Sequence, residues 1–294
     1  MGVKMIRDQF GDAYYKVGLH IHTTLSDGVR TPEEVAREYA ADGYDAVAFT
    51  DHWYYGESRT VEGLAVLSGC EYNLGGGDTS FDTMHIIGIG MKKDPRLTKE
   101  NTRQEVVDAI NKAGGIAVLG HPNWSLNGVE DLANLTGITA TEIYNAVSEA
   151  HNSLRAYSGY FVDLCANRGM YPYLLATDDS HYYDGSDNRR GWVMVKAEDG
   201  SENALLSAIR RGDFYASQGP YLHVERKGNK LVIDCSPCRV IGTLSNGAWL
   251  PDRVLRGEDL RHFEYEIKPL EKWVRVEVED ADGRLAWSNI FVIE

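Results

Sequence analysis

The stretch that decides the fold reads Gly18-Leu19-His20-Ile21-His22-Thr23-Thr24-Leu25-Ser26-Asp27-Gly28. Apolar residues and histidines alternate in its first half, which predicts a strand over Val17–His22. Residues two apart on a strand point to the same side, so His20 and His22 can converge on one ion. The turn that follows places Asp27 just beyond the strand. The pattern indicates a buried strand that carries ligands to its carboxyl end.

Short apolar runs alternate with helical stretches as far as about residue 213. Further strands are predicted over residues 44–50, 64–72, 84–90, 116–119, 140–143, 172–176 and 191–195. Helices are predicted over residues 31–43, 101–112, 154–168 and 202–211; the first has an N-cap residue, a proline and two acids in Thr31-Pro32-Glu33-Glu34. This alternation predicts the α/β class, with βα units around a mostly parallel sheet that is either open or closed into a barrel.

The pattern changes after residue 213. Residues 222–225 and 231–235 flank a hairpin signal, and residues 273–279 and 285–293 read as half-buried strands joined by Asp282-Gly283. We therefore predict two domains, a metal-binding barrel over residues 1–213 and a small antiparallel β-sandwich over residues 214–294. Four aromatic residues are expected in the core of the sandwich or at its seam with the barrel: Phe214, Tyr215, Trp287 and Phe291.

Composition and charge narrow the classes of partner. The formal net charge is -14, and an acidic surface disfavours broad nucleic-acid binding, although a local basic pocket stays open as an alternative. The N-terminus lacks a signal-peptide pattern, and no apolar run approaches the roughly 20 residues that span a bilayer. The four cysteines are too few and too scattered for a disulfide framework. We expect a cytoplasmic, soluble protein without a membrane partner, and the oligomeric state stays open.

Histidines and acids recur at the ends of the predicted strands. Asp51 and His52 follow the second strand, Glu71 ends the third, His85 begins the fourth and His121 follows the fifth; Asp178, Asp179 and His181 follow the seventh. Parallel α/β folds build their sites at the carboxyl ends of strands. Imidazole and carboxylate are the ligands of zinc, manganese and iron sites. A single histidine at such a place is usually structural, but its recurrence at strand after strand predicts a metal centre.

These motifs resemble those of the PHP (polymerase and histidinol phosphatase) family, in order and in rough spacing, across residues 17–195. The resemblance rests on Leu19–Thr23 with Ser26–Gly28, Thr50–His52, Gly69–Glu71, His85–Gly88, Gly120–Pro122 and Asp179–His181. It implies a distorted (β/α)7 TIM-like barrel and a metal-dependent hydrolase. The C-terminal region is similar to the β-domain of the CehA/McbA-like group within that family, through Gly212–Ser217, Gly219-Pro220 and Ala286–Asn289.

The resemblance also implies which residues hold two or three divalent ions, which would be zinc, manganese or iron. The first ion would be held by His20, His22, Glu71 and Asp179. The second would be held by Glu71, His85 and His121, so that Glu71 bridges the pair, and the third by Asp27, His52 and His181. Family members have either histidine or aspartate at the position of Asp27, which leaves the occupancy of the third site open.

The expected reaction is hydrolysis of a small phosphorylated molecule, such as a nucleotide or sugar phosphate, by a metal-bound hydroxide. Glu71 and Asp179 would serve catalysis through the ions. Asp51 or Asp178 would protonate the leaving group or, as the simpler alternative, orient the neighbouring ligands. Predicted substrate contacts are a phosphate clamp formed by Arg189 and Arg190, together with the side chains of Asn145, Trp53 and Trp124 around the mouth of the site.

Three alternatives stay open from the sequence. The same ions would also serve a hydrolase of carbamate, ester or amide bonds, or a 5'-3' exonuclease. A non-catalytic module that binds ligands through its β-domain is a further class. The loop that contains Asp78 is expected to be a lid or a segment without function, and His151 is expected to be a structural residue.

Overall fold

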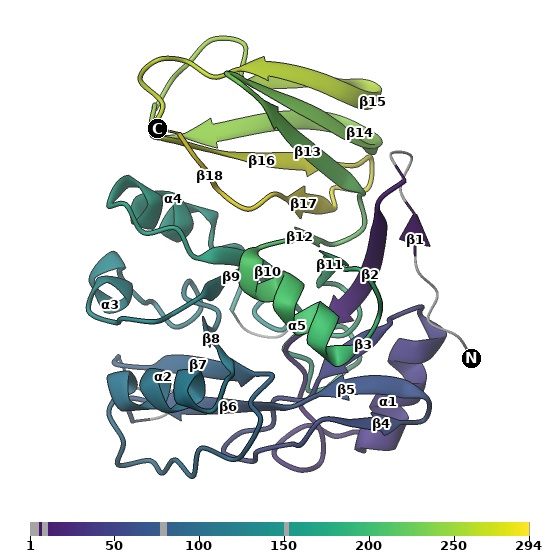
Figure 1. Ribbon diagram of the computed structural model, residues 1–294, viewed down its shortest axis with the longest axis vertical. Coiled ribbons are helices and arrows are strands. Elements are labelled where there is room, and N and C mark those ends of the chain that lie inside the picture. Colours follow the sequence, from purple (N-terminus) through teal and green to yellow (C-terminus); the bar gives the residue numbers. More distant parts are fainter. Residues whose placement is uncertain (1–5, 8–10, 77–80, 150–152, 294) are drawn as a thin grey trace.

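The computed structural model describes residues 6–7, 11–76, 81–149 and 153–293. Its strands form two sheets (Figure 1). The smaller sheet has the order β10-β9-β8-β7-β6, with bounds Tyr173–Thr177, Ala140–Asn145, Ile116–Leu119, Met84–Ile89 and Gly69–Leu74. The larger sheet includes β2 (Ala13–Gly18), β3 (Ala46–Ala48), β4 (Arg59–Val61), β5 (Leu64–Leu67), β11 (Trp192–Lys196) and β12 (Phe214–Ser217), and β1 (Ile6–Arg7) pairs with β2.

Five helices are described: α1 (Pro32–Ala41), α2 (Arg103–Lys112), α3 (Val129–Ala133), α4 (Gly159–Asn167) and α5 (Glu202–Arg211). Thr31 and Thr102 begin α1 and α2 with reciprocal capping boxes to Glu34 and Glu105. Gly212, at φ 75°, ends α5 in the left-handed conformation that glycine adopts at low cost. The sequence predicted four of these helices, and the short α3 was missed.

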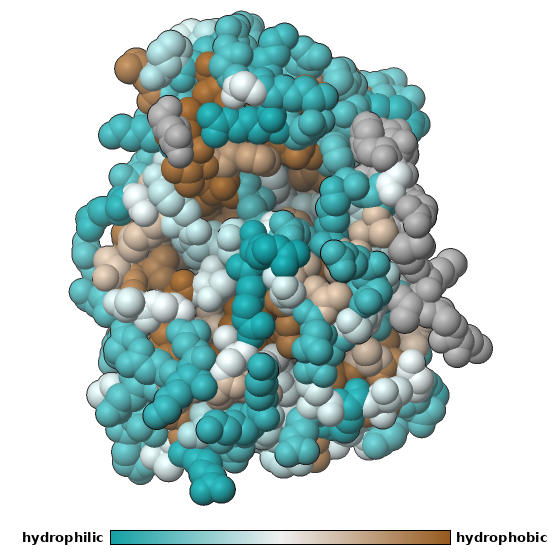
Figure 2. Space-filling model, viewed as in Figure 1, coloured by the Kyte–Doolittle hydropathy of each residue, from teal (hydrophilic) through white to brown (hydrophobic). Residues whose placement is uncertain are grey.

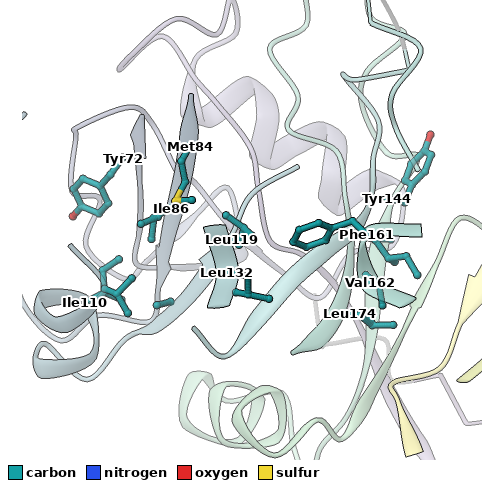
Figure 3. Close-up of a cluster of buried hydrophobic side chains, with 14 of the residues drawn as sticks. Tyr72, Met84, Ile86, Ile110, Leu119, Leu132, Tyr144, Phe161, Val162 and Leu174 are labelled. Carbon is teal, nitrogen blue, oxygen red and sulfur yellow. The ribbon is translucent and has the colours of Figure 1, made fainter. Parts of the chain in front are cut away.

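The two sheets pack face to face around a shared core. Val17, Ala46 and Leu67 of the larger sheet lie in one buried cluster with Ile87 and Val118 of the smaller sheet. A second cluster covers the other face of the smaller sheet, where side chains of α2, α3 and α4 pack on those of the strands (Figure 3). Burial of both faces explains why these strands are almost continuously apolar in sequence.

The C-terminal strands extend the larger sheet. They are β13 (Leu222–Lys227), β14 (Lys230–Ser245), β15 (Val254–Glu266), β16 (Trp273–Glu279), β17 (Leu285–Trp287) and β18 (Phe291–Val292). They lie at one end of the molecule and join the rest through the pairing of β12 with β17 (Figure 1). Hydrophobic side chains gather in the hollow between this end and the rest of the chain (Figure 2). Trp287, Phe214 and Tyr215 are buried at or beside this junction, as the sequence predicted.

The α/β class is confirmed, whereas the closed barrel is not. No ladder joins the two sheets into a ring within the described residues. The predicted strand 64–72 is interrupted at Ser68, so that β5 lies in one sheet and β6 in the other. Gly69 makes this crossing possible, because a Cβ there would lie 2.4 Å from the carbonyl oxygen of Phe49. In addition, β6, β7 and β8 pair antiparallel, where the sequence suggested mostly parallel neighbours.

Among the described residues, no helix is both long and apolar enough to cross a bilayer. The predictions for Asp78 and His151 lie outside the described residues.

Candidate metal centre

Nine predicted ligands converge at one edge of the two sheets. Their nitrogen and oxygen atoms form three groups within which all ligand atoms lie within 4.8 Å of one another. The groups are His20, His22, Glu71 and Asp179; Glu71, His85 and His121; and His22, Asp27, His52 and His181. The first two groups are entirely buried, and only Asp27 in the third is exposed. The grouping expected from the family resemblance therefore has a geometric counterpart, with His22 added to the third group.

The backbone brings the first group together beyond the ends of β2 and β10. His20 and His22 follow β2 rather than lying within it, because the strand ends at Gly18. The carbonyl oxygen of His20 accepts from the amide of Asp179 at 2.8 Å, and the amide of His22 donates to Ser180 at 2.9 Å. Asp179 adopts φ 51°, a left-handed conformation that is costly for a residue with a Cβ. The backbone is therefore strained at Asp179, the residue that carries a ligand carboxylate of the first group.

Glu71 is shared by the first two groups. Its Oε2 lies 3.2 Å from His20 Nε2 and 3.0 Å from His22 Nε2. Its Oε1 lies 2.9 Å from His85 Nδ1 and 3.3 Å from His121 Nε2. One carboxylate therefore offers an oxygen to each of two neighbouring imidazole pairs.

The third group is looser. Asp27 Oδ1 lies 3.4 Å from His22 Nδ1 and 3.5 Å from His181 Nε2, and its Oδ2 lies 3.6 Å from His52 Nε2. Gly28 holds this turn against the preceding chain, because a Cβ there would lie 2.7 Å from the carbonyl group of His22. Asp27 thus closes the third group from a turn that packs directly on the first.

The electrostatics of the cluster favour positive charge. Burial lowers the pKa of His20, but the carboxylates of Asp179, Glu71 and Glu142 outweigh it and hold that pKa well above its usual value. Burial raises the pKa of Glu71, but His20, His85 and His52 hold it well below its usual value. Carboxylates that retain protons on neighbouring imidazoles would also attract a divalent cation, which would displace those protons.

Two buried polar atoms lack the partner that a metal ion would supply. Within the described residues, Asp179 Oδ1 and His52 Nδ1 make no hydrogen bond although both atoms are buried. Asp179 Oδ1 nevertheless faces His20 Nε2 at 3.2 Å and His22 Nε2 at 3.1 Å. Buried polar atoms without partners are costly, so this arrangement fits a cation between imidazole nitrogens and carboxylate oxygens.

A cavity of about 370 Å³ opens over the three groups. Besides seven of the nine ligands, its walls are Trp124, Val147, Ser148, Ser153 and Tyr183. Trp124 packs edge-on against His121 at a centroid distance of 4.9 Å, and Tyr183 stacks on His181 at 5.1 Å. Two aromatic rings therefore flank the cluster, one beside the second group and one beside the third.

Comparison with known proteins places this geometry in a family. A family model described as the PHP domain matches residues 18–189, which are more than half of the chain and include all nine candidate ligands. The chain belongs to the PHP domain family. An uncharacterised protein of Methanocaldococcus jannaschii is 27% identical to this PHP protein over 123 residues, which cover 36% of this chain and 67% of the relative.

A solved structure agrees with the fold over the whole chain. A two-domain protein from Bacteroides vulgatus, described as containing a predicted PHP-like metal-dependent phosphoesterase, matches with a TM-score of 0.56 and 14% identity. The match covers 100% of this chain and 98% of the other. A lesion-specific endonuclease Q from Pyrococcus furiosus matches at a TM-score of 0.48 and 15% identity, over 67% of this chain and 56% of the other. At 14% identity the likeness to the Bacteroides vulgatus protein concerns the fold alone.

The PHP centre includes one carboxylate that sequence reasoning missed. Glu142, on β9, is completely buried, and its Oε1 lies 2.7 Å from His20 Nδ1. An ionised carboxylate only accepts hydrogen bonds, so Nδ1 carries a proton, and once a cation displaces the second proton the lone pair of Nε2 would face Glu71 and Asp179. The only sequence signal for Glu142 is an acid inside an otherwise uncharged buried strand.

Asp51 and Asp178 do not line the cavity. Asp51 accepts hydrogen bonds from Thr23 and Ser26, which hold the turn that carries Asp27. Asp178 accepts from the Tyr39 hydroxyl at 2.6 Å and from the backbone amides of residues 189, 190 and 191. Burial raises the pKa of Asp178 to about 6 in spite of these bonds. The geometry favours the orienting role for both carboxylates over the role of proton donor.

The predicted substrate contacts are only partly brought to the cavity. Trp124 lines it, whereas Arg189, Arg190, Asn145 and Trp53 do not. Arg190 instead pairs with Glu149 at 2.8 Å, and the Arg189 Nε donates to the side chain of Asn188. Asn145 donates to Glu142 at 2.8 Å and to Asp179 at 3.1 Å, and Trp53 Nε1 donates to Asn73. Asn145 therefore supports the ligand carboxylates instead of facing the cavity.

Proposed function

We propose that this PHP protein is a metal-dependent phosphoesterase that hydrolyses a small phosphorylated molecule of the nucleotide or sugar phosphate class. The observation that carries the proposal is Glu71, whose Oε1 faces His85 and His121 while its Oε2 faces a separate set, His20, His22 and His52. When bound, divalent ions in these two groups would lower the pKa of a water molecule, and their positive charge would stabilise the phosphate oxygens. The description of the Bacteroides vulgatus protein is consistent with this reaction.

The chain's own residues would hold the ions in three groups. His20, His22, Glu71 and Asp179 would hold one ion, and Glu71, His85 and His121 the other. Asp27, His52 and His181, with His22 nearby, would hold a third. A mixed set of imidazole and carboxylate ligands suits zinc, manganese or iron.

The remaining walls would bind the organic part of the substrate. Trp124 and Tyr183 offer aromatic surfaces to a base or another planar group. Ser153 lines the same cavity, and its buried hydroxyl has no hydrogen-bond partner within the described part of the chain. A hydroxyl without a partner at a cavity wall is suited to a polar group of a ligand.

A neutral substrate is the second candidate, namely a carbamate, ester or amide hydrolysed on the same ions. The observation that favours it is the composition of the cavity wall, because no lysine or arginine among the described residues lines it. A 5'-3' exonuclease is a subcase of the phosphoesterase. The expectation that nucleic acid is disfavoured rests on the net charge of -14 alone.

We retain the division of the chain as part of the proposal, with residues 1–213 carrying the reaction and residues 214–294 forming the β-sandwich.

The test combines metal analysis with a substrate panel. Purified protein loaded with zinc, manganese or iron would be assayed on a phosphomonoester, a phosphodiester, an oligonucleotide and an aryl carbamate. We expect divalent-ion-dependent phosphoester turnover, which Glu71→Gln abolishes and the exposed control Glu149→Gln preserves. Turnover of the carbamate alone would select the second candidate. A fully metal-loaded protein that hydrolyses none of the four would refute both.

A further inference from the structure

The C-terminal strands contact the wall of the cavity through a buried polar cluster. Arg275 on β16 is completely buried and forms a bidentate ion pair with Asp163 on α4, with contacts of 2.7 and 3.2 Å. Its Nη1 also donates to Glu277 at 3.0 Å. Breaking such a buried pair leaves uncompensated charge, so the cluster fixes how β16 sits against α4.

Tyr157 joins this cluster from the segment that precedes α4. Its hydroxyl donates to Glu277 at 2.6 Å and accepts from Arg275 at 3.3 Å. Its ring stacks on Trp287 at a centroid distance of 6.2 Å, and Tyr144 stacks on Trp287 as well, at 5.9 Å. The indole of Trp287 donates to the same Glu277 at 3.0 Å. Gly159 leaves room for the Tyr157 ring, because a Cβ there would lie 2.2 Å from it.

The segment that carries Tyr157 is bonded to the end of β9. Ala156 accepts from the amide of Asn145 at 3.1 Å, and the amide of Ser158 donates to Ile143 at 2.8 Å. The amide of Arg155 donates to Ser148 at 3.0 Å. Residues 155–158 therefore run along residues 143–148 and are fixed from the other side by β16 and β17.

Val147 and Ser148 of the first segment line the cavity, and so does Ser153, which precedes the second segment by two residues. Ser148 donates through its hydroxyl to Asn145 at 2.7 Å. Asn145 in turn donates to the ligand Asp179 at 3.1 Å. A continuous set of contacts thus leads from Glu277 through Tyr157 and the paired backbones of residues 155–158 and 143–148 to the cavity wall.

We propose that the C-terminal strands act as a positioning element of the PHP site: Trp287, Glu277 and Arg275 hold the segment around Tyr157, and with it the wall formed by Val147, Ser148 and Ser153. The role assigned to substrate affinity rests on the proposed function, whereas the role assigned to the wall does not. Among the metal ligands, this set of contacts reaches Asp179 through Asn145, and Asp179 is also held by its own backbone bond to His20. Loss of the Tyr157 hydroxyl should therefore loosen the wall and leave the ions in place.

The decisive variant is Tyr157→Phe, which keeps the aromatic ring on Trp287 and removes only the hydroxyl. Hydrogen exchange of peptides covering residues 143–149 and 153–158 would report the wall directly, and tryptic cleavage after the exposed Arg155 would report the same opening. We expect both to speed up by about tenfold, the equivalent of one hydrogen bond to a charged group. Manganese stoichiometry and affinity, measured by calorimetry, should stay unchanged.

The matched control is Tyr265→Phe, which also removes a hydroxyl bonded to a carboxylate, here that of Glu271, in the C-terminal region but away from the cavity. It should change neither exchange nor cleavage at residues 143–158. In the phosphoester assay, Tyr157→Phe should raise KM by about tenfold with kcat within about twofold, because the wall binds the substrate and the ligands are intact.

Unchanged exchange and cleavage in Tyr157→Phe would overturn the inference, and so would faster exchange without any change in KM. Loss of bound manganese in that variant would also overturn it, because the contacts would then support the ligands instead of the wall. If the wild-type protein turns over no phosphoester, the proposed function fails. The positioning of the wall is then decided by exchange and cleavage alone.

Discussion

Replacement of Glu142 by glutamine tests whether this buried carboxylate sets the ligand geometry of His20. Glu142 accepts four hydrogen bonds. Its Oε1 accepts from His20 Nδ1 and from the Thr177 hydroxyl, both at 2.7 Å. Its Oε2 accepts from the amide of His121 at 2.7 Å and from Asn145 at 2.8 Å. Glutamine has one oxygen and one NH2 group in place of the two oxygens. One of the two pairs of hydrogen-bond donors would therefore face the NH2 group, which is itself a donor.

The expected loss follows from these contacts. If the amide nitrogen faces His20, the imidazole must turn or move its proton to Nε2, the atom that faces Glu71 and Asp179. If it faces the His121 amide instead, the backbone at a second ligand is disturbed. Removal of such supporting partners typically lowers metal affinity by about 10- to 100-fold, which corresponds to about 1.4 to 2.7 kcal/mol. We expect this loss in calorimetric titration with manganese or zinc.

Glu149→Gln is the matched control, because Glu149 bonds to Tyr144 and Arg190 at an exposed position and has no contact with a ligand. Its metal affinity should equal that of the wild type. Circular dichroism should show the native fold in both variants. Metal affinity of a folded Glu142→Gln protein within twofold of the wild-type value would refute the reasoning that this carboxylate fixes the His20 tautomer.

The other predictions concern individual parts of the molecule. His20→Ala should remove bound metal and turnover while the fold stays intact, as measured by metal analysis and circular dichroism. Gly28→Ala should lower the metal stoichiometry by one, because its Cβ, 2.7 Å from the backbone of residue 22, displaces the turn that carries Asp27. Arg275→Met should lower the free energy of unfolding in urea by about 3 kcal/mol, because it leaves the carboxylates of Asp163 and Glu277 without their buried partner.

Gly28→Ala and Arg275→Met each have a matched control. Gly128→Ala places a Cβ 3.7 Å from its nearest neighbour and should keep the metal stoichiometry. Arg211→Met removes an ion pair with Asp213 whose side chains are 59% and 42% exposed, and should cost below about 1 kcal/mol. Full activity of His20→Ala would contradict the role of His20 as a metal ligand. Full metal stoichiometry of Gly28→Ala would contradict the close packing of the turn that carries Asp27. Equal stability of Arg275→Met and Arg211→Met would contradict the contribution of the buried ion pair.

Ligand candidates were predictable because of where strands end. His52 and His121 follow the carboxyl ends of β3 and β8, whose apolar runs are clear in the sequence, whereas Glu71 lies within β6. Strand ends on one side of an α/β core lie close together whether neighbouring strands pair parallel or antiparallel. The ligand side chains therefore converge even though, within the described residues, no ladder closes the strands into a ring. Pairing direction depends on tertiary contacts such as the crossing at Gly69, which a periodicity of apolar residues does not encode.

Supporting residues were harder to predict for a physical reason. Arg190 follows a ligand loop in sequence and was therefore expected at the substrate, but its backbone amide is used to bind Asp178 and its guanidinium pairs with Glu149. A sequence shows which side chain is charged but not whether its backbone fixes where that side chain points. Glu142 presents the opposite case, since an acid within a buried strand is costly and needs partners that only the folded structure identifies.

The C-terminal strands matter to the site although, among the described residues, none of their histidines or acids belongs to the three ligand groups. A cavity wall built from loop residues has no ladder of its own, so its position depends on what packs behind it. Here that support is a buried arginine with two carboxylates and a tryptophan between two tyrosines. Such a cluster has few alternative arrangements, because each partner that is lost leaves a desolvated charge or polar group. Under this proposal, sequence changes in the C-terminal region would alter substrate affinity without altering the metal ligands.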